Sequence, residues 1–282
     1  MTSLRELFAR LRQVLPGTVR SDRGFVTLVG AGPGAADLLT LGGLKALMEA
    51  EHVLYDRLVG AEVLALIPAH VVQEDVGKLT GQDHQQTQAR IGQRLLALAQ
   101  AGKRVVRLKG GDPFIFGRGG EELAILAAHD LPFAVIPGVT AALGCAAYAG
   151  IPLTHRDYAQ QVSFVTAHCQ RSVDRVDWTA LGQSTHTVVF YMGVAQLPLI
   201  EARLLAAGRA PHTPVALIER GSTAAQRVVL ADLQSLAAAG RAQQIAAPAL
   251  VVVGEVAALG ESLAWFSEPL RYAGEQAIHH AA

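Results

Sequence analysis

The chain contains few cysteines and no excess of charge of either sign. Its 282 residues include only two cysteines, Cys145 and Cys169, and 24 Lys+Arg balance 24 Asp+Glu. Two cysteines are too few for a disulfide framework or a zinc cage, and they suit a reducing compartment. We expect both to be core residues. A neutral chain has no basic field that would attract nucleic acid, so an acidic ligand must be met by a local cluster of cations.

Segments that would carry the chain to or across a membrane are also missing. The two longest uncharged runs, residues 131–154 and 179–200, are interrupted by glycine or proline, so neither is typical of a membrane span. Residues 1–20 have apolar side chains at helical spacing, but Arg5, Arg10 and Arg12 interrupt them, which favours a short amphipathic helix over a signal peptide. No Cys/His spacing suits a metal, and no serine elbow suits a hydrolase. We therefore expect a cytoplasmic protein without a metal.

Strand-like apolar runs alternate with helical patterns along the first part of the chain. Strands are expected at 24–29, 53–55, 71–74, from 105, and at 133–136, with helices at 40–50, 87–101 and 121–129. Strands separated by helices of about 10–15 residues predict βαβ units and a parallel sheet. The fold class is therefore α/β.

The rhythm changes to small residues over 137–157, and a second alternating set follows. Strands are expected at 162–167, 187–192, 215–219, 227–230 and 250–253, with helices at 196–207 and 233–239. Several of these strands are short, so we expect antiparallel pairs in this half. The predicted organisation is an N-terminal extension (1–23), two α/β domains (24–137 and 138–266) and a loose tail (267–282).

A glycine-rich loop, Gly-Ala-Gly-Pro-Gly, follows the first strand at residues 30–34. It differs from a dinucleotide fingerprint because its third glycine comes early, Pro33 removes a backbone donor, and the helix waits until about Thr40. Close backbone approach without a phosphate cradle favours a nucleoside-like ligand that has no phosphates. Two alternatives stay open: a dehydrogenase, in which Asp56 would bind a ribose, and a tight turn with no ligand.

The longest stretch of unusual composition is residues 105–122. A buried strand ends in Gly110, Gly111 and Asp112, and an apolar block with further glycines follows. In a parallel sheet, ligands bind in the crevice beyond the carboxyl ends of the strands, so this loop is a candidate binding loop. The same residues would also make an ordinary turn.

Charged side chains concentrate at the expected strand ends and in the loops after them. They are Asp56, Arg57, Lys78, Arg107, Lys109, Arg118, His155 and Arg156. On a neutral protein, cations gathered on one rim would suit an anionic substrate, although any one of them could be a solvated surface charge. Asp56 could act as a base, or could only cap a helix or form an ion pair.

Three further strand ends carry candidate ligand contacts. Thr140 follows one strand of the first half, while Met192 and Gly221 follow strands of the second half. Such a pattern matches a ligand held between the halves. Thr140 could equally cap a helix, and Met192 could be a core residue.

Taken together, these motifs resemble the tetrapyrrole methylase family, and within it the members that methylate uroporphyrinogen III. The match runs from about Phe25 to Trp265, and its pieces are residues 29–34, 55–59, 76–78, 104–122, 137–142, 150–157, 190–193 and 248–254. The long 104–122 segment and 151–157 are the specific parts. The resemblance implies two α/β domains, a homodimer, and S-adenosyl-L-methionine in the interdomain cleft.

The resemblance also implies residue roles and a reaction. The donor would contact Pro33, Gly110, Gly111, Asp112, Ile115, Thr140, Ala141, Met192 and Gly221. Asp56 matches the proposed proton acceptor and Lys78 the proposed donor. Two pyrrole carbons of uroporphyrinogen III would be methylated through precorrin-1 to precorrin-2, a precursor of sirohaem, cobalamin and haem d1, leaving S-adenosyl-L-homocysteine. The substrate carboxylates would meet Arg57, Arg107, Arg118, His155 and Arg156.

The sequence departs from the family pattern next to Lys78. Leu79 stands where the family usually has arginine, and the segment 81–90 has an extra residue and lacks a usual glutamate near Ala89. These departures bear on substrate affinity and on the alignment of Lys78. Two other readings therefore stay open: a methyltransferase acting later on the corrin ring, and a tetrapyrrole-binding paralogue without catalysis.

Overall fold

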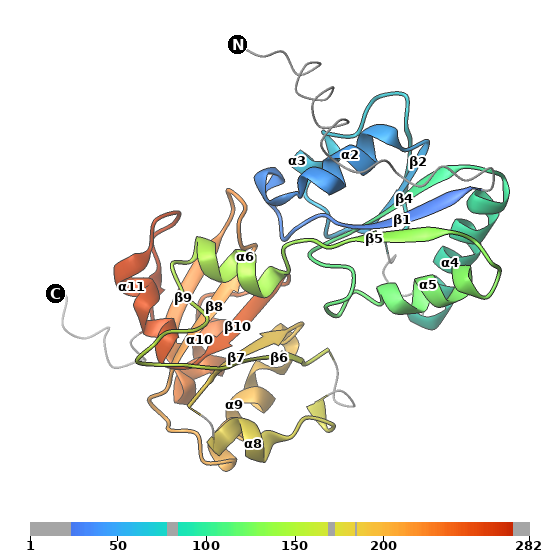
Figure 1. The fold of residues 1–282 in the computed structure, drawn as a ribbon. Helices are drawn as coiled ribbons and strands as arrows, with labels where there is room; N and C mark the ends of the chain where they lie inside the picture. The colour runs from blue at the N-terminus through green and yellow to red at the C-terminus, as the bar shows by residue number, and fades with distance from the viewer. Residues whose placement is uncertain (1–23, 78–83, 169–172, 184, 273–282) are drawn as a thin grey trace, which may run out of the picture. The chain divides into compact units, whose positions relative to one another are not determined.

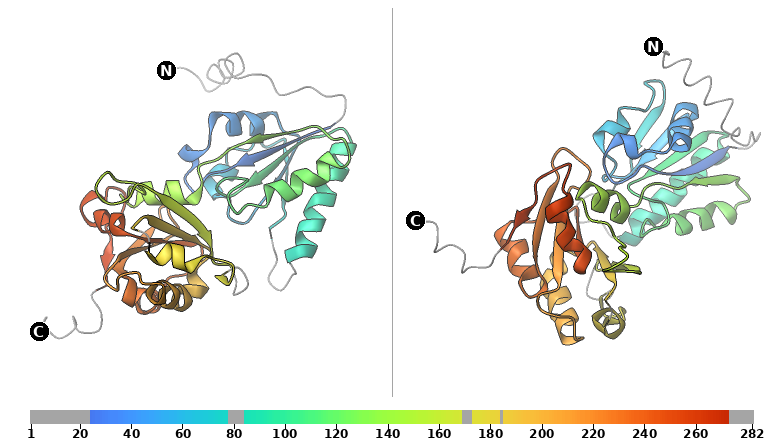
Figure 2. Two further views of the ribbon diagram at one scale, coloured as in Figure 1. Left: turned by 60° about the horizontal axis from the view of Figure 1, so that its bottom comes forward. Right: turned by 60° about the vertical axis from the view of Figure 1, so that its left-hand side comes forward.

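The structure is a computed structural model that describes residues 24–77, 84–168, 173–183 and 185–272. It forms two compact units that divide between Thr140 and Ala141. Figures 1 and 2 show a sheet with helices on both faces in each unit. No helix in the described ranges is long and apolar enough to cross a membrane. The helix expected over 1–20, Lys78 and Cys169 lie outside these ranges.

The first unit is built on five parallel strands. They are β1 (Phe25–Gly30), β2 (His52–Tyr55), β3 (Val72–Asp75), β4 (Arg104–Lys109) and β5 (Phe133–Ile136). The sheet order is β3-β2-β4-β1-β5. β1 is buried along its whole length and β4 at every position after Arg104, as expected for central strands covered on both faces.

The helices of this unit are divided between the two faces of the sheet. The short η1 (Ala36–Leu38), then α2 (Leu41–Glu49) and α3 (Ala61–Leu64), follow β1 and β2, whereas α4 (His84–Gln100) and α5 (Gly119–Ala127) follow β3 and β4. Thr40 is the N-cap of α2, because its hydroxyl accepts a hydrogen bond from the Gly43 N–H at 3.0 Å. One apolar cluster joins α2 and α3 to the sheet and a separate one joins α4 and α5 (Figure 1).

This division produces a switch point between β1 and β4. The two strands are neighbours, yet the chain leaves β1 toward one face of the sheet and leaves β4 toward the other. In open α/β sheets, ligands bind beyond the carboxyl ends of the strands at such a point. The loops at residues 30–34 and 110–118 flank this point.

The second unit contains a six-stranded mixed sheet of order β11-β9-β8-β10-β7-β6. The strands are β6 (Val162–Thr166), β7 (Thr187–Tyr191), β8 (Pro214–Glu219), β9 (Arg227–Asp232), β10 (Ala249–Val253) and β11 (Leu270–Arg271). The expected antiparallel pairs are confirmed: β10 runs antiparallel to both β7 and β8, and β8 to β9. The β6–β7 and β9–β11 pairs are parallel.

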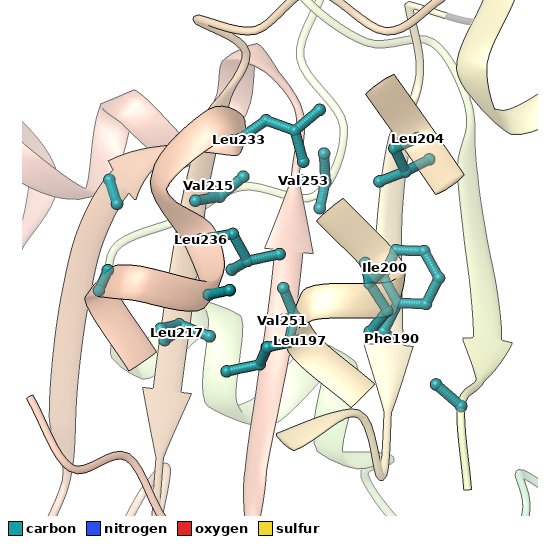
Figure 3. Close-up of a cluster of buried hydrophobic side chains, with 14 of the residues drawn as sticks. Phe190, Leu197, Ile200, Leu204, Val215, Leu217, Leu233, Leu236, Val251 and Val253 are labelled. Carbon is teal, nitrogen blue, oxygen red and sulfur yellow. The ribbon is translucent and has the colours of Figure 1, made fainter. Parts of the chain in front are cut away.

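Helices cover both faces of this sheet as well. They are α6 (Ala141–Tyr148), α8 (Trp178–Gln183), α9 (Leu197–Ala206), α10 (Leu236–Ala242) and α11 (Gly260–Leu263), with the short η2 (Val194–Gln196), η3 (Leu233–Ser235) and η4 (Glu255–Leu259). Figure 3 shows the core under α9 and α10, where Ile200 of α9 lies beside Phe190 of β7. On the opposite face, Cys145 of α6 is buried in a second cluster, as predicted.

The prediction of a loose tail from residue 267 is wrong for residues 267–272. Leu270 and Arg271 pair with β9, and the Tyr272 N–H donates to the Leu230 carbonyl at 2.8 Å. The Gln226 side chain donates to the Ser267 hydroxyl at 2.9 Å. A strand of two residues has too little pattern to be recognised in a sequence, and here pairing with β9 creates it.

Candidate functional site

Three backbone turns meet at the carboxyl ends of β1, β4 and β5. Gly32 and Gly111 exchange two hydrogen bonds, with N···O distances of 3.1 and 2.7 Å. A Cβ atom on Gly30 would lie 2.4 Å from the Gly138 nitrogen, and one on Gly138 would lie 2.3 Å from the Gly111 carbonyl oxygen. Only glycine allows backbones to approach this closely. We call these four residues the glycine crossing.

Asp112 ties the glycine crossing together. One carboxylate oxygen accepts hydrogen bonds from the N–H groups of Phe114 at 2.8 Å and Ile115 at 3.3 Å. The other oxygen accepts from the Gly138 N–H at 3.0 Å, which connects the loop after β4 to the loop after β5. The carboxylate is therefore a turn residue that also fixes the loops after β4 and β5 relative to each other.

Exposed apolar side chains border the glycine crossing. Phe114, Ile115 and Phe116 are 56%, 37% and 38% exposed, and Leu58, in the loop after β2, is 63% exposed. Leu58 also lies against Gly110, where an added Cβ would be 2.9 Å from the Leu58 Cβ. Polar backbone beside an apolar surface suits a ligand with both characters. Leu58 lies in the matching segment 55–59, but the sequence analysis did not single it out as a ligand contact.

A buried cluster of charges lies beneath the carboxyl ends of β2 and β4. Arg107 donates from Nη2 to Asp56 and from Nε to Glu122, the latter at 3.2 Å. Lys109 Nζ lies 3.0 Å from Glu122 Oε1 and 3.9 Å from Asp56 Oδ2. Gln88, from α4, donates to the same Glu122 oxygen at 3.1 Å. We call Asp56, Arg107, Lys109 and Glu122 the charge cluster.

The cluster corrects the prediction that Arg107 binds a substrate carboxylate. Arg107 is 1% exposed, and its Nη1 donates to the Leu54 and Leu108 carbonyls at 3.4 and 3.1 Å. Alternation along the buried strand turns this side chain into the layer between the sheet and α5, where its donors are already used. Its position near a strand end was readable in the sequence, whereas its burial required knowledge of what covers β4.

Burial and neighbouring charges act differently on the two cations. Burial lowers the pKa of Arg107, but the charges of Asp56 and Glu122 outweigh it, so the net pKa is raised. For Lys109, burial and then the charge of Arg107 lower the pKa despite the two carboxylates.

The remaining predicted residues of the first unit are placed as follows. Arg57 and Arg118 are exposed, and Arg118 forms an ion pair with Glu121 at 2.6 Å. Pro33 is half-buried and Thr140 is buried. Arg118 has a left-handed backbone with φ 58°, as does Phe116 with φ 54°, a strained conformation for residues other than glycine.

Three predicted donor contacts of the second unit come together. Ala141 begins α6, and the next residue, Ala142, donates its N–H to the Tyr191 hydroxyl at 2.8 Å, beside Met192 at the end of β7. Gly221, after β8, packs so closely on α6 that an added Cβ would lie 2.4 Å from the Cys145 sulfur. Met192 is 46% exposed, so it is not a core residue.

The loop after β8 is strained, and the loop before β6 is held locally. Arg220 and Ser222, which flank Gly221, have φ 48° and 61°, and Met192 has φ 56°. Left-handed residues other than glycine are costly and gather at functional sites. Predicted substrate contacts His155 and Arg156 lie in the loop before β6, where the Asp157 N–H donates to the His155 ring at 3.1 Å.

Comparison with known proteins gives a consistent match. The family of tetrapyrrole (corrin/porphyrin) methylases matches residues 26–237. A siroheme synthase of Xylella fastidiosa (strain M12) is 54% identical over 261 residues, which cover 93% of this chain and 55% of the relative. A siroheme synthase of Pseudomonas fluorescens (strain Pf0-1) is 53% identical over 259 residues, with 91% and 55% covered. The chain thus spans about half the length of the curated relatives it matches.

Solved structures match over nearly their whole length. The uroporphyrin-III C-methyl transferase of Thermus thermophilus, complexed with S-adenyl homocysteine, is 41% identical with a TM-score of 0.71, and the match covers 83% of this chain and 93% of that one. A cobalt precorrin-4 methyltransferase of cobalamin biosynthesis is 26% identical with a TM-score of 0.74, covering 83% and 95%. The first structure is more similar to this chain in sequence, and the two structures have comparable TM-scores to it.

Proposed function

Because this chain belongs to the tetrapyrrole methylase family, we propose that it methylates two pyrrole carbons of uroporphyrinogen III with S-adenosyl-L-methionine as donor. The products would be precorrin-2, formed through precorrin-1, and S-adenosyl-L-homocysteine. The observation that carries this proposal is the 41% identity to a uroporphyrin-III C-methyl transferase over 93% of that structure. The name siroheme synthase of the curated relatives agrees with it.

The donor fits the first unit because the switch point offers backbone and apolar surface rather than phosphate ligands. We propose that residues of both units hold the donor, namely Pro33, Gly110, Gly111, Asp112, Ile115, Thr140, Ala141, Met192 and Gly221. The glycine crossing holds the loops after β1, β4 and β5 in close contact, and Ile115 is exposed beside it. Bound there, the donor supplies an electrophilic sulfonium methyl group, so the protein's main task is to align it with a ring carbon.

Asp56 is the proposed base that removes a proton from the methylated ring. Its side chain is 28% exposed, whereas those of Arg107 and Lys109 are 2% and 3% exposed. The ion pairs with Arg107 and Lys109 hold the Asp56 carboxylate in place, and its exposed part can contact a substrate. Lys78 is the proposed proton donor. Arg57, Arg118, His155 and Arg156 are proposed to bind substrate carboxylates, of which Arg57 and Arg118 are exposed.

Incubation of the protein with uroporphyrinogen III and S-adenosyl-L-methionine under anaerobic conditions tests the activity. A dimethylated product, with a singly methylated intermediate at early times, is expected. Asp56→Asn should lower turnover by about 10²–10⁴-fold, the range of general base catalysis. Methylation only of a corrin-ring substrate would instead favour the later methyltransferase, and binding of the tetrapyrrole without turnover would favour a non-catalytic paralogue. Binding of NAD in place of the methyl donor would favour a dehydrogenase.

We further propose that the protein is a cytoplasmic homodimer. Low cysteine content supports a reducing compartment, and the family resemblance supports the dimer. Light scattering after size-exclusion chromatography tests the assembly. A mass equal to one chain of 29.7 kDa at assay concentration would contradict it.

A further inference from the structure

Glu122 is a buried carboxylate with an uneven set of partners. It is 0% exposed, and its Oε1 accepts hydrogen bonds from Gln88, Arg107 and Lys109 at 3.1, 3.2 and 3.0 Å. Its Oε2 has no partner among the described residues. Removing an ion from water costs several kcal/mol, and a buried ion pair often stabilises no more than apolar side chains would. Folding stability alone therefore gives a weak reason for this arrangement.

Glu122 affects the net charge that surrounds Asp56. Arg107 and Lys109 carry positive charge, and Asp56 and Glu122 carry negative charge, so the ionised cluster is neutral. Asp56 is the member that reaches solvent, with 28% of its side chain exposed against 3% or less for the others. Without Glu122, both cations would act on Asp56 alone. They would hold its carboxylate more tightly and make it a weaker base.

The other charged side chains described on the neighbouring elements form no ion pair with the charge cluster. On α5, Arg118 and Glu121 pair with each other at 2.6 Å and are exposed, so solvent screens them. On α4, Gln88 is neutral, and Arg94 is occupied by Glu74 at 2.9 Å. Arg57, next to Asp56 in sequence, is exposed. Among the described residues, Arg107 and Lys109 are the cations that form ion pairs with Asp56.

We propose that Glu122 is a positioning residue, which neutralises part of the positive charge of Arg107 and Lys109 and so keeps Asp56 basic enough to accept the substrate proton. This inference rests on the proposed methyltransferase activity. Glu122 touches neither substrate nor donor, and it acts through the two cations.

Opposite charge changes in the cluster test the inference through the pH profile of kcat/KM. Glu122→Gln leaves the cluster one charge too positive, so the acid limb should move to lower pH and kcat should fall by about tenfold or more. Lys109→Met leaves it one charge too negative, and the acid limb should move to higher pH. Combining both changes restores neutrality, and the acid limb should return to the wild-type position.

Glu51→Gln serves as the matched control. Glu51 pairs with Lys103 at 3.3 Å and accepts from the Arg104 N–H at 2.9 Å, at the amino end of the same strand. Its loss should leave the pH profile unchanged. Donor affinity, measured by calorimetry with S-adenosyl-L-homocysteine, should stay within about twofold in every folded variant, because the donor contacts are intact.

The outcomes separate the inference from the function on which it rests. Absence of dimethylated product from the wild-type protein would contradict the proposed function itself. If the wild type is active, the result that overturns the role of Glu122 is an acid limb of the pH profile that does not move in Glu122→Gln and Lys109→Met. An acid limb that moves in the same direction in both variants would overturn it as well. Should Glu122→Gln not fold, Lys109→Met and the neutral double variant still decide the question, because only their relative shift is needed.

Discussion

At the scale of single residues, Asp112 decides how firmly two loops are held. Asp112→Ala removes the acceptor for three backbone N–H groups, and we expect it to lower the free energy of unfolding by about 1–3 kcal/mol. Donor affinity should fall at least tenfold, because the loops after β4 and β5 lose their connection. Thermal unfolding and calorimetry with S-adenosyl-L-homocysteine measure the two effects.

Asp75 provides the control for this change. Its carboxylate accepts from the Gly77 N–H at 2.7 Å, a similar turn after the edge strand β3 that does not involve the glycine crossing. Asp75→Ala should leave donor affinity unchanged. Equal donor affinity in wild type and Asp112→Ala would show that Asp112 is only a turn residue.

Cys145 makes stability depend on pH in the alkaline range. Burial raises the pKa of its thiol from an ordinary 9.0 to about 12. Because the folded-state pKa is the higher one, the stabilisation is complete below pH 9 and is lost as the pH rises toward 12. The loss amounts to about 1.4 kcal/mol for each pH unit above 9.

Denaturant titrations of wild type and Cys145→Ala from pH 7 to 10.5 isolate this contribution from other titrating groups. The two curves should run parallel below pH 9 and converge above it. Parallel curves over the whole range would show that the thiol remains as acidic in the folded protein as in the unfolded chain.

Residue types at the site could be predicted more readily than their surroundings. Asp112, Met192 and Gly221 were placed at strand ends because glycine, proline and polar residues interrupt apolar runs there. The pairing of Glu122 with Arg107 and Lys109 could not be predicted, because it depends on how α5 lies on the sheet. Helical periodicity marks Glu122 only as an acid in the first turn, where the helix dipole would also favour it.

At the scale of elements, the glycine crossing leaves no room for a side chain where the three loops meet. Gly30→Ala would place a Cβ 2.4 Å from the Gly138 nitrogen and 2.7 Å from the Gly111 carbonyl oxygen. Both are backbone atoms that cannot rotate away, so we expect a loss of about 1–3 kcal/mol or more in the free energy of unfolding. Donor binding should weaken with it.

Gly120→Ala is the matched comparison. Gly120 lies in the first turn of α5, and nothing lies within 4 Å of an added Cβ. Alanine should therefore stabilise the helix by about 0.5–1 kcal/mol. Chemical denaturation measures the change in the free energy of unfolding of each variant, which should be a loss for Gly30→Ala and a gain for Gly120→Ala. Similar losses in both would contradict the close packing of the three turns.

Long apolar strands were predictable, and so were the short strands β2, β3 and β5, but the shortest elements were not. The strands beginning near Phe25 and Val105 are continuous apolar runs, which indicate central strands of a parallel sheet. In contrast, α3 has four residues and β11 has two. Such segments are shorter than the window over which periodicity can be recognised, so neighbouring elements determine their conformation.

At the scale of the whole molecule, amide hydrogen exchange tests whether the proposed donor contacts of each unit respond to the donor. Binding of S-adenosyl-L-homocysteine should slow exchange at residues 30–34 and 110–116 of the first unit and around Met192 and Gly221 of the second. Protection confined to the first unit would contradict the proposed contribution of the second. Exchange in β9 should not change, since no proposed donor contact lies there.

The order of the strands in the first sheet could not be predicted from the sequence pattern. Alternating strands and helices predicted parallel pairing, but they are compatible with several orders. The order β3-β2-β4-β1-β5 depends on which face each crossover takes, and it makes β1 and β4 neighbours whose loops meet. Two motifs 80 residues apart in number, Gly30 and Gly110, therefore become adjacent.

The glycine crossing has a consequence for how such a protein can diversify. Its geometry resides in main-chain atoms and strand connectivity, so altering the side chains around it leaves the contacts between the three loops in place. Exposed residues around it, such as Leu58, Arg57 and Arg118, can then change without disturbing these contacts. A scaffold with this division of labour can give rise to enzymes that share one group donor and act on successive ring systems.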